Sequence, residues 1–93
     1  MNPRALQNNE ELFEYLIQLR SSLEMYQHHE LAEIVNQASR FISGSASEFM
    51  HEAQLALKRV RKEQPKELSN SEIQDLDAVL NQIKETFRMI GGA

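Results

Sequence analysis

The chain has 93 residues, a formal net charge of -4 at pH 7, 41% hydrophobic and 26% charged residues, and no cysteine. These values are typical of one small folded domain, and they exclude disulfides, thiolate metal sites and cysteine nucleophiles. The negative charge disfavours nonspecific binding to nucleic acid, and no apolar run approaches the ~20 residues of a membrane-spanning helix. We expect a single soluble, cytoplasmic domain over residues 1–93 that has no membrane partner.

The first predicted helix covers residues 9–26 and has an unusually wide apolar side. One stripe is formed by Leu12, Leu16, Leu19, Leu23 and Tyr26. Phe13 and Ile17 add an adjoining second stripe, which widens the apolar arc to roughly 200° and predicts cover from two directions, by core or by another chain. Arg20 lies inside this arc, with Glu24 as its expected ion partner. Its guanidinium either reaches water past a packed stem or forms a salt bridge at an interface.

The second predicted helix covers residues 29–43, and its separation from the first is the least marked boundary. The segment "MYQHHE", residues 25–30, contains neither glycine nor proline. One ideal helix running through it would rotate the apolar stripe by roughly 80°, which predicts a break near residues 27–29. A single continuous helix is the alternative.

The stretch "FISGSASEF", residues 41–49, is the densest run of small residues and raises the question of a phosphate-binding loop. A P-loop requires a lysine and a hydroxyl after its glycines, whereas Glu48 places negative charge where the anion would bind. Gly44 fits a left-handed residue after the second helix, and Ser45 with Glu48 fits a capping box. We expect a joint that leads into a third helix over residues 46–63, ended by Pro65.

The fourth predicted helix covers residues 70–90. Ser69 and Glu72 have the spacing of a second capping box, and Gly91 and Gly92 mark the end of the helix. No segment shows sustained alternation of apolar and polar residues, so no sheet is expected. Short connections between four amphipathic helices predict an all-α fold, either a compact four-helix bundle or an orthogonal helical array.

The segment "HHELAE", residues 28–33, resembles the start of a zinc-protease motif but has Glu33 at the position of the second histidine. His29, Glu33 and His51 would at most form a weak metal site. The favoured interpretation is a surface pair of His29 and Glu33, one helical turn apart. His28 is expected to be partly buried at a helix boundary. No cofactor or metal is expected.

The segment "KRVRKEQPK", residues 58–66, holds half of the ten basic residues: Lys58, Arg59, Arg61, Lys62 and Lys66. Cations at a helix C-terminus interact favourably with the helix dipole, so a solvated face is the first interpretation. An acidic protein partner is the second, and nucleic acid is the third. Leu55 lies on the polar side of the same helix, either as a single exposed leucine or as an interface anchor with a charged rim.

The predicted function is a small protein–protein interaction module of the adaptor, regulator or inhibitor type, bound to a protein partner or to a second copy. Carboxylates lie at helix starts and on polar faces, and no serine occupies a nucleophile elbow, so no enzyme activity is expected. The alternatives are a nucleic-acid-binding or transcription-linked protein using residues 58–66 and, last, a weak metal-dependent enzyme. The candidate partner-binding residues are Phe13, Ile17, Arg20, Leu55, Lys58, Arg59 and Lys62.

Overall fold

The computed structural model of the chain describes residues 8–89. These residues form α1 (Asn9–Met25), α2 (His29–Ser39), a 3-10 turn η1 (Arg40–Ser43), α3 (Ala46–Glu63) and α4 (Asn70–Met89). No strand occurs between residues 8 and 89, and the all-α prediction is confirmed. The predicted end of the last helix at Ile90, and its stop at Gly91 and Gly92, lie outside the described residues.

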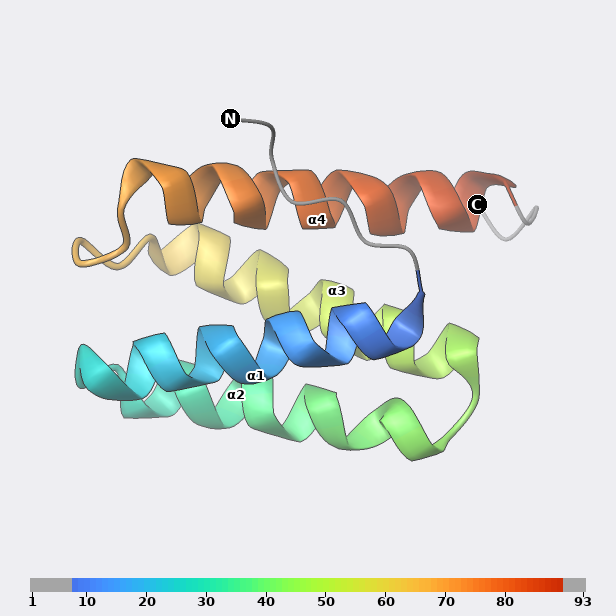
Figure 1. Cartoon of the computed structure of the whole chain (residues 1–93), viewed down its shortest axis with the longest axis horizontal. Coiled ribbons are helices and arrows are strands. Elements are labelled where there is room, and N and C mark those ends of the chain that lie inside the picture. The colour runs from blue at the N-terminus through green and yellow to red at the C-terminus, as the bar shows by residue number, and fades with distance from the viewer. Residues whose placement is uncertain (1–7, 90–93) are drawn as a thin grey trace.

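The four helices run along the long direction of the molecule and alternate in direction, as an up-and-down bundle does (Figure 1). Each helix packs against the next one in the chain, and α1 also contacts α3. The radius of gyration is 12.5 Å, close to the ~12.3 Å expected for a compact chain of this length. Of the two predicted arrangements, the bundle describes the structure better.

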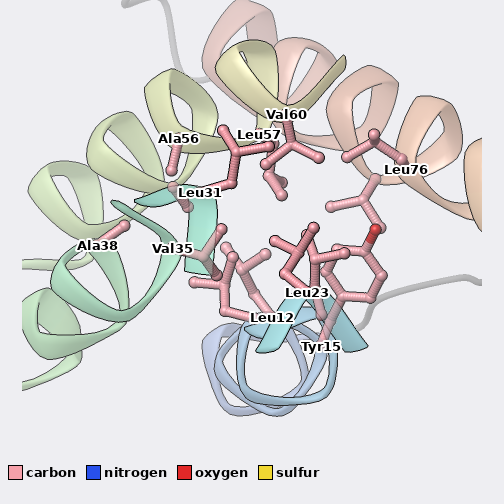
Figure 2. Close-up of a cluster of buried hydrophobic side chains, with 14 of the residues drawn as sticks. Leu12, Tyr15, Leu23, Leu31, Val35, Ala38, Ala56, Leu57, Val60 and Leu76 are labelled. Atoms are coloured by element: carbon pink, nitrogen blue, oxygen red, sulfur yellow. The ribbon is translucent and has the colours of Figure 1, made fainter. Parts of the chain in front are cut away.

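The hydrophobic core lies between the helices and is built from the apolar sides predicted for all four (Figure 2). Removing one large aliphatic or aromatic side chain from water stabilises the fold by about 1.5–3 kcal/mol, so this shared core is the main source of stability. The largest fully buried side chains are Leu16, Leu23, Val35, Phe49, Leu57, Val60, Leu76 and Val79.

A sharp turn separates α1 from α2 and confirms the predicted break. The turn is a Schellman motif, in which the Gln27 N–H donates to the Glu24 carbonyl at 3.0 Å and the His28 N–H donates to the Leu23 carbonyl at 2.8 Å. Gln27 has a φ of 67°, which lies in the left-handed region that residues other than glycine rarely adopt. The chain therefore reverses at residue 27 and lays α2 back along α1.

The joint between α2 and α3 differs from its prediction at Gly44, whose φ of -96° is not left-handed. The chain leaves α2 through the 3-10 turn, where the Gly44 N–H donates to the Phe41 carbonyl at 2.9 Å, so no left-handed residue is needed. The left-handed residue of the next joint is Gln64, with a φ of 47° at the end of α3. A side chain at position 44 would meet Glu48, because an added Cβ would lie 3.1 Å from Glu48 Oε1.

Both predicted capping boxes cap a helix. The Ser45 hydroxyl accepts from the Glu48 N–H at 3.1 Å at the start of α3. At the start of α4 the exchange is reciprocal, since the Glu72 N–H donates to Ser69 Oγ at 3.1 Å and the Ser69 N–H donates to Glu72 Oε1 at 2.9 Å. These bonds satisfy backbone donors that a helix start leaves unpaired.

Candidate functional site

Both residues of the predicted second stripe of α1 are partly buried, and one of them packs on the core. Phe13 is partly buried and packs on the core, and Ile17 is also partly buried. α1 contacts α2 and α3, so its wide apolar arc is covered from more than one direction within the chain. This side of α1 offers less exposed apolar surface than its sequence indicates.

Arg20 has a partner within the chain, but a different one from that predicted. Its Nη1 donates to Asn36 Oδ1 of α2 at 2.9 Å, in a partly buried position. Glu24 instead pairs with His29 Nδ1 at 3.0 Å. The guanidinium therefore links α1 to α2 through Asn36, a residue that no sequence pattern marks as a partner.

The expected surface pair of His29 and Glu33 does not form. His29 turns back toward α1 and Glu24, and Glu33 Oε2 accepts from Gln37 Nε2 at 3.4 Å. Because α2 starts directly after the tight turn at Gln27, its first residue lies beside the end of α1. Within residues 8–89, no group of three or more His, Asp or Glu side chains is placed to hold a metal ion.

His28 is partly buried, as predicted, and connects distant parts of the chain. Its Nε2 lies 2.7 Å from Glu67 Oε1, in the connection between α3 and α4. The hydrogen bond with His28 is the largest of the causes that hold the pKa of Glu67 below its ordinary value of 4.5. This contact joins the start of α2 to the loop that leads into α4.

Ion pairs within the molecule engage two residues of the basic segment 58–66. Arg59 bonds to Glu30 of α2 at 3.3 Å and to Glu63, one turn on, at 3.0 Å. Arg61 bonds to Asp77 of α4 at 2.7 Å. Two of these pairs reach neighbouring helices and one lies within α3, and together they leave less uncompensated positive charge than the sequence indicates.

An open, partly apolar groove of about 450 Å³ lies between α2 and α3. We call it the α2–α3 groove; it is lined by Ile34, Gln37, Ala38, Phe41, Glu52, Leu55, Ala56 and Arg59. Leu55 is 49% exposed at its edge, which confirms the predicted exposure of this leucine. Ile34 and Phe41, which the sequence assigns to the apolar side of the second helix, are only partly buried here. Ile34 and Phe41 also pack against the core, so the exposed apolar surface of the groove centres on Leu55.

Other hollows are smaller or more polar. A hollow of about 210 Å³ between α1 and α4 has Leu12, Met50 and Ile83 in its lining, and Arg20 with Asn36 lies in a hollow of about 420 Å³ between α1 and α2. Among residues 8–88, the other large exposed apolar side chain is Met25, 74% exposed at the end of α1, where no sequence pattern indicates a role. Neither hollow combines an exposed large apolar side chain with an apolar lining.

The exposed side of α3 carries the remaining predicted residues, and its charges are sorted along the helix. We define the α3 face as Glu48, His51, Glu52, Leu55, Lys58, Arg59 and Lys62, of which all but the partly buried Glu52 are exposed. Acidic residues precede Leu55 and basic residues follow it. Among residues 8–89, no ion pair involves Glu48, Glu52, Lys58 or Lys62.

The candidate residues thus fall on two surfaces that lie on different sides of α2. Arg20 reaches Asn36 on one side, whereas Arg59 reaches Glu30 on the side of the α2–α3 groove. No family model, curated protein or solved structure matches the chain. In the part of the chain that the structure describes, no helix has the length and apolar character needed to cross a membrane.

Proposed function

We propose that the protein is a protein–protein interaction module and that the α2–α3 groove is its binding surface. The observation that carries the proposal is Leu55, 49% exposed at the edge of an apolar groove, whereas every other leucine among residues 8–89 is buried or partly buried. Covering this leucine together with Ile34 and Phe41 would remove contiguous apolar surface from water, which favours association.

The rim of the groove supports a protein as the bound molecule over nucleic acid. Arg59, the basic residue that lines the groove, is held by Glu30 and Glu63, so the rim presents both signs of charge. A nucleic-acid surface needs an uncompensated basic stripe, whereas protein interfaces combine an apolar centre with a mixed polar rim.

Photo-crosslinking at position 55 tests this proposal. A benzoylphenylalanine at position 55 is expected to form covalent adducts with a protein in living cells, because the probe would lie inside the contact. The same probe at Asn81, an exposed position of α4, is the matched control and is expected to give no adduct. Unlabelled wild-type chain should compete for the adduct, and a chain with Leu55→Glu should not.

Adducts of equal yield at positions 55 and 81, or competition by the Leu55→Glu chain as strong as by wild type, would contradict the groove as the binding surface. Circular dichroism of each variant checks that its helices are intact. A specific, competed adduct with nucleic acid in place of protein would favour the alternative function.

A further inference from the structure

We infer that the molecule covering the α3 face is a second copy of the same chain, packed with its α3 antiparallel and the two-fold axis close to Leu55. This inference rests on the proposed function, since it names the partner of that binding surface. It is carried by the order of charges along the α3 face and by the exposed leucine at the centre of that order.

The charges of the α3 face are complementary to themselves when one helix is reversed. Glu48 lies seven residues before Leu55 and Lys62 lies seven residues after it, while Glu52 and Lys58 lie three residues before and after. In two antiparallel helices that cross at Leu55, residues equally far before and after it lie at the same level, because each residue rises 1.5 Å. Glu48 of one copy then faces Lys62 of the other, whereas Glu52 and Lys58 lie at the same level on opposite flanks of Leu55, a separation that their long side chains can span.

Two-fold symmetry makes every such contact occur twice, so the two acids and two lysines of each copy all gain an opposite charge. A parallel arrangement would place Glu48 against Glu48 and Lys62 against Lys62, and like charges at an interface oppose association. The charge order therefore selects the antiparallel arrangement.

Among the residues that the structure describes, no ion pair within the chain satisfies these charges. Glu48 and Glu52 lie one turn apart on the same side of α3, and so do Lys58 and Lys62, which sets like charges beside each other. In the antiparallel pair each acid has a lysine of the other copy as neighbour. At the centre the two Leu55 side chains cover each other at the edges of the two α2–α3 grooves, which shields apolar surface from water.

Charge reversal tests the inference directly. The basic variant carries Glu48→Lys with Glu52→Lys, and the acidic variant carries Lys58→Glu with Lys62→Glu. Each variant alone faces like charge across the two-fold axis, so its dimer dissociation constant should rise at least about tenfold over wild type. An equimolar mixture of the two variants should form a heterodimer at least as tight as the wild-type dimer. Sedimentation velocity up to about 500 µM covers the weak association expected of a small interface.

Two controls separate this surface from general effects of charge and from the other candidate surface. Lys84→Glu changes an exposed charge on α4 and should leave the dissociation constant unchanged. Ile17→Glu alters the side of α1 and should leave the dimer intact, provided that circular dichroism shows folded helices. Raised salt should weaken the wild-type dimer, because its exposed ion pairs are screened.

A monomeric wild type over the whole concentration range would overturn the second copy as partner. So would a dimer unchanged in both charge-reversed variants, or one lost with Ile17→Glu in a folded chain. In these cases crosslinking at position 55 decides the proposed function separately, because a competed adduct with a different protein would keep the groove as a binding surface. A mixture that fails to associate would also overturn the antiparallel pairing.

Discussion

Replacing Gln27 with glycine should stabilise the protein, because this residue holds the turn between α1 and α2 in a left-handed conformation. Its φ is 67°. The left-handed conformation costs a residue with a side chain about 1–2 kcal/mol of conformational free energy, whereas it costs glycine little. Glycine also makes the unfolded chain more flexible, which opposes the gain by about 0.5–1 kcal/mol. The net expectation for Gln27→Gly is a gain of about 0.5–1 kcal/mol in the free energy of unfolding.

Urea denaturation followed by circular dichroism measures this change, and a thermal melt should shift upward by about 2–8 °C for a domain of this size. Gln37→Gly is the matched control, since Gln37 is an exposed glutamine inside α2. There glycine lowers helix stability by about 1 kcal/mol relative to a good helix former. The two substitutions should therefore have opposite signs.

Equal destabilisation by both substitutions would refute the argument, because it would mean that residue 27 is helical and that α1 and α2 are one continuous helix. Hydrogen exchange at His28 gives an independent check. Its N–H should be protected by the bond to the Leu23 carbonyl, which closes the turn at 2.8 Å.

Two further predictions concern burial and charge. Leu57→Ala should lower the free energy of unfolding by about 2–5 kcal/mol, because Leu57 is fully buried. Leu55→Ala, on the exposed side of the same helix, should change the free energy of unfolding by less than about 0.5 kcal/mol. Urea denaturation of the monomer measures both changes. The pKa of Glu67, lowered by its hydrogen bond with His28, should move back toward 4.5 in His28→Ala, as measured by carboxyl NMR titration. Because the folded pKa lies below the unfolded one, Glu67 stabilises the fold above about pH 4.5 and loses this effect as the pH falls through its lowered pKa. An unchanged Glu67 titration in that variant would contradict the role of His28.

Local signals made the helices predictable. Apolar spacing and the serine caps placed the third helix over residues 46–63, the bounds that the structure gives to α3. The residues that end helices are harder to predict, because glycine is the usual sequence marker of left-handed backbone. Gln27 and Gln64 carry that conformation, and their side chains give no signal of it. Gly44 is extended because the chain leaves α2 by a 3-10 turn.

The candidate site was predictable in its parts and not in its assembly. The polar neighbours of Leu55 on a helical wheel predicted its exposure correctly. The openness of the α2–α3 groove depends on the spacing between two helices, which no single helix encodes, so Ile34 and Phe41 were assigned wholly to an apolar side. Long-range partners such as Glu30 for Arg59 are likewise invisible before the helices are placed.

The helix dipole offers a competing reason for the charge order of α3, and it explains only the outer pair. Acids near a helix start and lysines near its end are stabilised within the first and last turns, where Glu48 and Lys62 lie. Glu52 and Lys58 lie further inside the helix, beyond the reach of that effect. Each also has a like charge one turn away, which costs about 0.2–0.5 kcal/mol in an isolated helix. The proposed second copy would supply opposite charge to this inner pair, and Leu55, midway between them, is where it would cross.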